Sequence, residues 1–149
     1  MEPRTAPARL RSMPTWLLTQ VSTQGGRFVG DLIRARSAAH RYHYALLAAL
    51  AEFGPASQAE LGRRVGLDRS DVTTTIADLE RGGYAQRVPD PVDRRRNLVT
   101  ITDTGGRHLE HLDTAVRQAQ DELLAALSPA ERAELVRMLQ AVMDHHAPA

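Results

Sequence analysis

The spacing of apolar residues along the chain predicts six helices and one β-hairpin. In each helical segment, apolar residues recur every three or four positions, which is the period of one buried helix face. These segments are 15–38, 39–53, 57–65, 68–81, 102–126 and 128–146. The runs 84–88 and 98–102 contain strand-forming residues and flank a proline-containing turn, which predicts two paired strands. The pattern indicates a mainly α fold with one small hairpin.

The segment 57–84 carries the local signals of two helices joined by a tight turn. Ser57 and Glu60 are spaced for a capping box, in which each side chain accepts the other residue's backbone N–H. Gly66 suits the left-handed residue that ends a helix, and Asp68 suits the N-cap of the next one. The apolar stripe of this second helix is Val72, Ile76 and Leu79.

The opposite face of the second helix carries small hydroxylated side chains and one arginine. It consists of Arg69, Ser70, Thr73, Thr74 and, at its edge, Thr75. Such a face fits a DNA major groove, where Ser and Thr bond phosphates or base edges and Arg binds guanine with two hydrogen bonds. Ser57 and Gln58, at the N-terminus of the first helix, are further candidates for DNA contact. The alternative is the solvated face of an ordinary helical hairpin.

The turn between the predicted strands holds two prolines and three consecutive arginines, Arg94, Arg95 and Arg96. The prolines exclude a helix, so the arginines stand at the tip of the hairpin. A hairpin directly after a recognition-type helix is a wing. A guanidinium at its tip can enter a narrow minor groove, where the negative potential is strongest. The alternative is a solvated turn.

The two helices after the hairpin predict dimerisation. Thr102 is expected to cap the longest helix, and Ser128 begins the last one with a capping box and a proline at the first helical position. Together they carry more apolar surface than a small winged domain can cover, and pairing with a second copy buries it most simply. The seam of the longest helix is Leu109, Leu112, Val116, Ala119, Leu123 and Ala126.

Composition and charge limit the functions that the protein can have. The chain has 149 residues and a net charge of +1, and its 19 basic residues are all arginine. Residues 1–62 contain seven Arg and four acidic residues, and residues 63–96 contain eight Arg and six acidic residues. The residues after 96 contain four Arg and eight acidic residues. Because the positive excess lies before the C-terminal helices, the near-neutral total does not argue against nucleic-acid binding. The lack of cysteine excludes a disulfide framework, a thiolate zinc site and a thiol-based sensor.

No targeting or membrane segment is expected. Residues 1–14 lack the apolar run of a signal peptide and are predicted to be a flexible tail. No segment approaches the roughly 18 apolar residues of a membrane span, so a cytoplasmic protein is expected.

An enzyme is the contrasting hypothesis, and the sequence does not favour it. Asp78 and Glu80 lie two apart on a helix and point to different faces, which makes a poor acid/base pair. Neither a phosphate-binding glycine loop nor a nucleophile elbow is present in the sequence. A winged domain used only for protein contacts is a further alternative.

Over residues 16–146 the chain resembles the MarR family of bacterial transcription regulators. The resemblance rests on residues 43–47, 67–73, 79–84 and, most specifically, on the Asp- and Arg-rich run 90–96 closed by 100–102. It implies a winged helix-turn-helix plus a helical dimerisation region built from both chain ends. It also implies a homodimer that reads a palindromic operator in double-stranded DNA, with repression as the expected outcome.

The resemblance further assigns roles and boundaries. Arg69, Ser70, Thr73 and Thr74 belong to the recognition helix, Asp93 orients the wing, and Arg94 or Arg95 enters the minor groove. Thr74 departs from the family, which often has a basic residue there. The implied division is a tail over 1–14, an N-terminal dimerisation helix over 15–38, the winged domain over 39–102 and dimerisation helices over 103–146.

Family members often bind small aromatic or anionic effectors between the dimerisation and DNA-binding regions. Trp16, Tyr42 and His108 are candidates for lining such a site, at which we expect a small aromatic or carboxylate effector to bind; for Trp16 and Tyr42 the alternative is a role as packing anchors. The pairs His40/His43 and His108/His111 have a spacing that can share a metal. Without accompanying cysteine, however, we expect neither a metal nor another cofactor.

Overall fold

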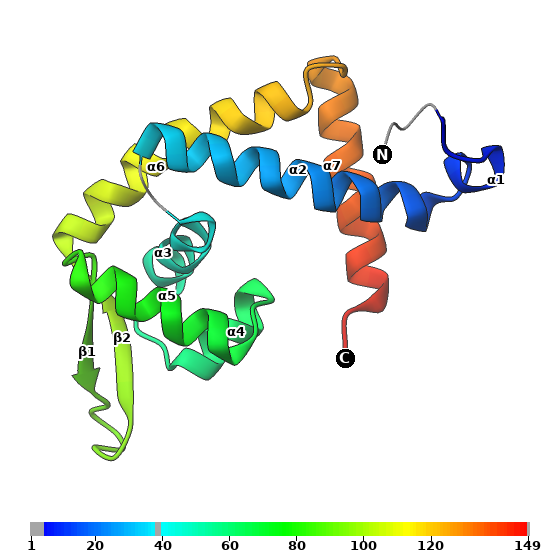
Figure 1. The fold of residues 1–149 in the computed structure, drawn as a ribbon. Coiled ribbons are helices and arrows are strands. Elements are labelled where there is room, and N and C mark those ends of the chain that lie inside the picture. Colours follow the sequence, from blue (N-terminus) through cyan, green and yellow to red (C-terminus); the bar gives the residue numbers. More distant parts are fainter. Residues whose placement is uncertain (1–4, 38–39, 149) are drawn as a thin grey trace.

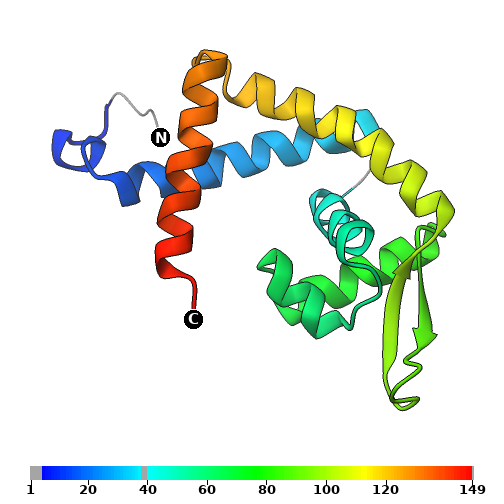
Figure 2. The ribbon, with the colours of Figure 1, turned by 180° about the vertical axis from the view of Figure 1, so that it is seen from behind.

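The computed structural model describes residues 5–37 and 40–148, and it has the shape of a long arm with a lobe at one end (Figure 1). In chain order the elements are α1 (Ala8–Arg11), α2 (Pro14–Ser37), α3 (Arg41–Phe53), α4 (Gln58–Val65), α5 (Arg69–Arg81), β1 (Ala85–Pro89), β2 (Asn97–Ile101), α6 (Asp103–Leu123) and α7 (Pro129–His146). Figures 1 and 2 show α2 and α6 side by side in the arm, with α3–α5 and the hairpin below one end and α7 running downward from the other. The fold is the predicted one: mainly α with a two-stranded wing.

The helix-turn-helix forms through the local signals that the sequence carries. The Ser57 N–H donates to Glu60 at 2.8 Å, and the Glu60 N–H donates to Ser57 Oγ at 3.2 Å, which completes the capping box. Gly66 takes the left-handed conformation, with φ 69° and ψ 32°. Asp68 caps α5 by accepting the N–H of Asp71 at 2.8 Å. The core beneath these helices is Leu46, Leu47, Leu50, Leu61, Val72, Ile76 and Leu79.

Several helix limits differ from the predictions. Helix α2 begins at Pro14, not with Thr15 as a cap, because proline is well suited to the first turn of a helix. With 24 residues against 21, α2 and not α6 is the longest helix. Thr102 does cap α6, accepting the Gly105 N–H at 3.0 Å. The segment predicted as a tail contains the short helix α1.

The wing is an antiparallel hairpin in which Ala85 pairs with Ile101 and Pro89 with Asn97. Each strand lies one residue away from its predicted position. Ala56 adds an isolated bridge to Val99, and the two exchange backbone hydrogen bonds of 3.1 and 2.8 Å. The bridge ties the middle of β2 to the loop before α4.

The apolar seam of α6 is covered by its own chain, which corrects the reason given for dimerisation. Leu112 and Ala119 are fully buried, chiefly by packing of α6 against α2 and α3, and Ala126 lies beyond the end of the helix. An added Cβ at Gly25 would lie 3.2 Å from Leu123, so this glycine allows α2 and α6 to cross closely.

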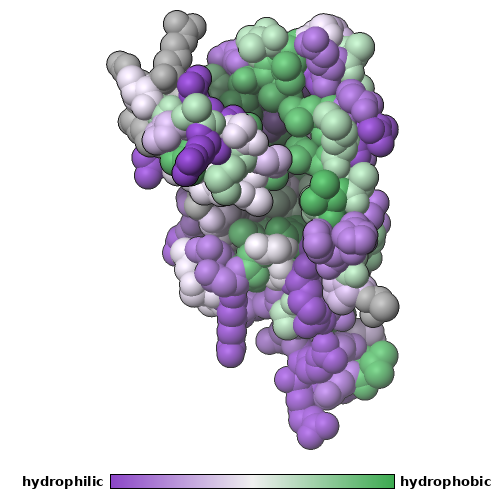
Figure 3. Space-filling view, turned by 90° about the vertical axis from the view of Figure 1, so that its right-hand side faces the viewer, coloured by the Kyte–Doolittle hydropathy of each residue, from purple (hydrophilic) through white to green (hydrophobic). Residues whose placement is uncertain are grey.

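Exposed apolar side chains gather instead on α7 and on the beginning of α2. Among the described residues of α7, none is buried. Figure 3 shows apolar side chains in the upper, hollowed part of one face, above a hydrophilic lower part. The exposed apolar residues of these two helices include Leu17, Leu18, Val21, Val136, Met138, Leu139, Val142 and Met143, and Met13 lies just before α2.

Candidate nucleic-acid interface

The outer face of α5 is exposed as predicted at Arg69, Ser70, Thr73 and Thr74. Thr75 is not part of it, since only 3% of its surface is exposed. It lies three residues after Val72 and four before Leu79, a spacing that places it on the buried stripe of the helix.

Two hydroxyl groups on this face already donate hydrogen bonds within the helix. Ser70 Oγ donates to Asp68 at 2.9 Å, and Thr73 Oγ1 donates to the Arg69 carbonyl at 2.8 Å. A hydroxyl has a single proton but two lone pairs, so these oxygens remain free to accept. In this arrangement they suit the amino groups that adenine and cytosine present in the major groove, and the Thr73 methyl suits a thymine methyl.

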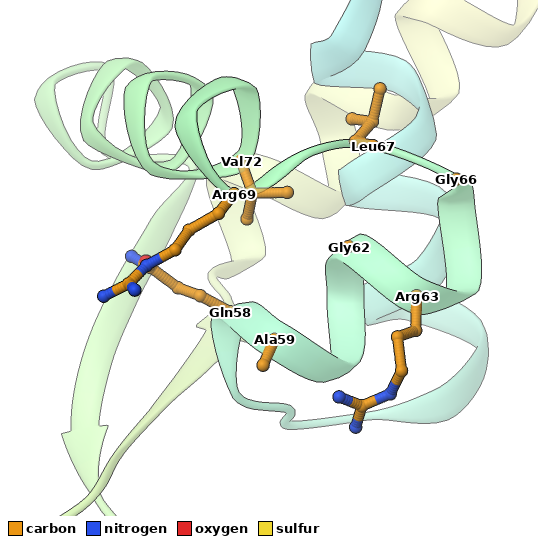
Figure 4. A pocket seen from close by; sticks show the side chains of 8 residues that line it. All are labelled: Gln58, Ala59, Gly62, Arg63, Gly66, Leu67, Arg69 and Val72. Carbon is orange, nitrogen blue, oxygen red and sulfur yellow. The ribbon is translucent and has the colours of Figure 1, made fainter.

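A cleft of about 490 Å³ lies between α4 and α5, next to this face (Figure 4). In Figure 4 Gln58 and Arg69 extend to one side of the cleft, and Arg63 borders its other side. The small side chains along α4 leave the cleft open, and two guanidiniums at its edge suit phosphate. The lining residues are Gln58, Ala59, Gly62, Arg63, Gly66, Leu67, Arg69 and Val72.

Arg63 was missed by the reading of the sequence. The available signal was the run of small residues Ala59, Gly62 and Gly66, which recur along α4 at helical spacing beside it. Ser57 was also predicted as a DNA contact. Its N–H donates to Glu60 and its oxygen accepts the Glu60 N–H in the capping box, so its hydroxyl proton can still be donated to a phosphate. Accepting the Ser57 N–H also holds the pKa of Glu60 below its usual value.

The tip of the wing is held by two aspartates. Asp90 accepts the Val92 N–H at 2.8 Å, and Asp93 accepts the Arg95 N–H at 3.1 Å and the Arg95 Nε–H at 3.3 Å. Within the described part of the chain, Arg94 has no ion-pair partner and is exposed. The tip is therefore a stiff turn in which Asp93 holds Arg95, while Arg94 and Arg96 are both exposed and have no ion-pair partner among the described residues.

The three residues predicted to line an effector site are not brought together. Tyr42 lines a cavity of about 320 Å³ between α2, α3 and α6. His108 instead stacks on Tyr84, and Trp16 lies half-buried near the beginning of α2. The cavity is lined by Gly26, Val29, Gly30, Ile33, Tyr42, Tyr44, Val116 and Gln120.

Comparison with known proteins identifies the family. A family model described as the MarR family matches residues 37–96, from the end of α2 to the wing. The HTH-type transcriptional regulator YxaD of Bacillus subtilis is 34% identical over 100 residues, which are 67% of this chain and 70% of YxaD. The chain belongs to the MarR family of transcription regulators.

One more relative and one solved structure extend the comparison. The HTH-type transcriptional repressor NicR of Pseudomonas putida is 30% identical over 101 residues, 68% of this chain and 64% of NicR. This chain thus spans less than two thirds of NicR. The PcaV transcriptional regulator of Streptomyces coelicolor, solved in complex with its natural ligand, superposes with a TM-score of 0.75 at 29% identity, covering 94% of this chain and 98% of that chain.

This MarR-family chain has a largely buried histidine, His43, near the junction of lobe and arm. Neither ring nitrogen of His43 has a hydrogen-bond partner in the described structure. Burial, and then the nearby His40 and His108, lower the pKa of His43 to about 4. His43 is therefore neutral at pH 7, and its 3.9 Å approach to Asp78 is not an ion pair there. Across residues 5–37 and 40–148, no group of three or more His, Asp or Glu side chains is placed to hold a metal.

Within the described ranges, no helix is both long enough and apolar enough to cross a bilayer.

Proposed function

We propose that this MarR-family protein is a homodimeric transcription regulator that binds a palindromic DNA operator in the cytoplasm and represses until a small ligand releases it. One observation carries the proposal: the small, hydroxylated face of α5 lies beside a stiff wing with an unrestrained arginine at its tip. An enzyme has no need of this combination, and neither does a module that only binds proteins. The comparison with the repressor NicR supports repression.

The proposed contacts divide by type. Arg69, Thr73 and Thr74 of α5 read base edges in the major groove, and Arg94 enters the adjacent minor groove. Asp93 orients the tip by holding Arg95. Gln58 and Arg63 position the lobe on the phosphate backbone from the cleft between α4 and α5. Of these residues, only Arg63 comes from the structure alone.

The proposed dimer forms through α7 and the beginning of α2, where the exposed apolar side chains lie. Two lobes related by two-fold symmetry require two half-sites, about one helical turn or roughly 10 base pairs apart from centre to centre. The ligand part of the proposal rests on the cavity between α2, α3 and α6, because α3 belongs to the lobe and the other two helices form the arm. PcaV, solved with its natural ligand, supports a ligand response in this fold.

Selection of bound sequences from random double-stranded DNA tests the proposal. We expect an enriched two-fold motif whose affinity falls steeply with salt. The same selection on an Arg69→Ala, Arg94→Ala variant should enrich no motif. Recovery of unenriched DNA by the unmodified protein would contradict the proposal, as would enrichment of a single, non-palindromic half-site.

A further inference from the structure

A hydrogen bond between two side chains joins the helices of the helix-turn-helix on their outer side. Thr73 Oγ1 of α5 donates to Oε1 of Gln58, the first residue of α4, at 3.3 Å. Figure 4 shows the Gln58 side chain extending from α4 toward α5, on the side of the cleft where Arg69 lies. Thr73 is exposed and Gln58 is half-buried. The bond therefore lies at the edge of the proposed DNA interface.

A glycine allows α4 and α5 to approach closely enough for this bond. An added Cβ at Gly62 would lie 3.0 Å from the Leu67 carbonyl oxygen and 3.4 Å from a methyl group of Val72. Gln58 lies four residues before Gly62 and therefore on the same face of α4. Thr73 directly follows Val72 on α5. The contact between the two side chains thus follows from the close packing of the two helices.

The Thr73 side chain is held at two points. Its hydroxyl has a single proton, which lies between the Arg69 carbonyl at 2.8 Å and the Gln58 amide at 3.3 Å. A threonine on a helix divides between two side-chain rotamers, because its hydroxyl can bond to a preceding backbone carbonyl in either. The contact with Gln58 comes from outside α5 and selects the rotamer in which Oγ1 faces α4. This selection fixes the directions of the Thr73 methyl group and of its remaining lone pair.

The Gln58 amide can hold Thr73 and a phosphate at the same time. When its oxygen accepts the Thr73 proton, both of its N–H groups are free to donate. When its NH2 group faces Thr73 instead, one N–H donates to Oγ1 and the other is free. In both orientations a phosphate oxygen can accept an N–H from Gln58, and Thr73 keeps a lone pair for a base.

We propose that Gln58 is a positioning residue for base recognition, which binds a phosphate and orients Thr73 toward the base edge that Thr73 reads. The inference rests on the proposed function and deepens it, because it makes part of the sequence preference depend on a residue that touches only the DNA backbone. A phosphate contact carries no sequence information by itself. Arg63 borders the same cleft, but the hydrogen bonds of Thr73 in the described part of the chain go to Arg69 and Gln58.

Base discrimination separates this role from simple phosphate binding. The full chain is titrated with the selected operator and with operators that carry the other base pairs at each position beneath α5. For the unmodified protein we expect about tenfold discrimination at the base pair that Thr73 reads. Thr73→Val has nearly the same shape without the hydroxyl and should lose this discrimination. Gln58→Ala should lose it at the same base pair.

Arg63→Ala is the matched control. It should weaken binding to all these operators by a similar factor and keep the discrimination, since its phosphate contact does not depend on sequence. A Gln58→Ala variant that binds more weakly but keeps the discrimination would overturn the inference.

The Gln58→Ala, Thr73→Val double variant tests whether the two residues act together. Its loss of affinity for the original operator should be smaller than the product of the two single losses, because each single change already removes the oriented Thr73 contact. A loss equal to that product would show that the two residues act independently and would overturn the inference.

The rotamer of Thr73 provides a measurement without DNA. Three-bond NMR couplings from the backbone to the Thr73 methyl carbon should report one rotamer in the unmodified protein and in Arg63→Ala. In Gln58→Ala they should report an average over two rotamers. A single rotamer in Gln58→Ala would overturn the inference. Because this measurement contains no DNA, its failure is distinct from failure of the operator selection, which would overturn the proposed function.

Discussion

Tyr84 and His108 stack face to face, with ring centroids 4.0 Å apart and planes 8° from parallel. Tyr84 directly follows the turn that ends α5, and His108 lies in the second turn of α6. The Tyr84 carbonyl also accepts the Thr102 N–H at 3.1 Å. An added Cβ at Gly105 would overlap this carbonyl, so glycine is required for the close approach. Tyr84 thus joins α5, the wing and the arm.

Loss of this stack should lower the free energy of unfolding measurably. We expect His108→Ala to lower the free energy of unfolding by about 0.5–1.5 kcal/mol, the usual contribution of an aromatic pair. His108→Phe, which keeps a ring, should lose less. Urea denaturation provides the measurement, and His111→Ala, at an exposed position on the same helix, is the control. Equal stability of the Ala and Phe variants would show that the stack contributes nothing.

The wing arginines should contribute charge to DNA binding. In the Arg94→Ala, Arg95→Ala variant, we expect weaker operator binding and a flatter salt dependence. The log–log slope should fall by about 0.9 for each lost phosphate contact. Fluorescence anisotropy across a salt series measures it. Arg34→Ala, which removes a guanidinium from α2, should retain the original slope; the same slope in all three proteins would mean that the wing is a solvated turn.

Replacing Asp93 distinguishes its role in orienting the wing from the effect of its negative charge on DNA affinity. Asp93→Ala removes a negative charge near the DNA, so electrostatics alone would increase affinity. We expect a decrease of about fivefold instead, because the bonds from the Arg95 backbone and side chain to Asp93 are lost and the tip loosens. Operator titrations at one salt concentration decide the sign. An increase in affinity would show that Asp93 does not orient the wing.

His43 should make stability depend on pH. Its pKa is lowered from 6.5 to about 4 in the folded state, so between these values the unfolded chain binds a proton that the folded chain does not. The free energy of unfolding should therefore fall as the pH decreases through this window, by up to about 3 kcal/mol. Urea midpoints from neutral pH down to about pH 4.5 measure the slope.

His43→Phe should flatten this slope, since the substituted ring cannot bind a proton. His111→Gln, at the exposed position on α6, should behave as the unmodified protein. A His43→Phe variant with the original pH dependence would assign the effect to other groups.

The apolar surface of α7 should support the dimer. Leu139→Glu combined with Val142→Glu places two charges where exposed aliphatic side chains now stand, and sedimentation should then show a monomer. Gln140→Glu adds one charge between them and should remain a dimer if position 140 lies outside the contact. A monomeric unmodified protein at micromolar concentration would remove the basis for a two-fold operator.

The sequence by itself determined the lobe and the exposed, hydroxylated face of α5. The signals that limit α4 and α5 act over only three or four residues, so hydrogen bonds within a single helical turn decide where each begins. Ser57 with Glu60 begins α4, Gly66 ends it and Asp68 begins α5. The proline- and arginine-rich turn was also correctly predicted as the tip of a hairpin, because prolines exclude a helix whatever the rest of the fold.

The tertiary structure alone decided what covers each apolar surface. An apolar stripe indicates that it will be buried but not by which partner, so the seam of α6 was assigned to a second chain although α2 and α3 of the same chain cover it. The cavity could not be foreseen, because Gly26, Tyr42 and Val116 come from helices distant in sequence. His108 was expected beside Tyr42 but stacks on Tyr84. Contacts between distant segments depend on how the helices cross, and the spacing of residues within one helix does not predict this.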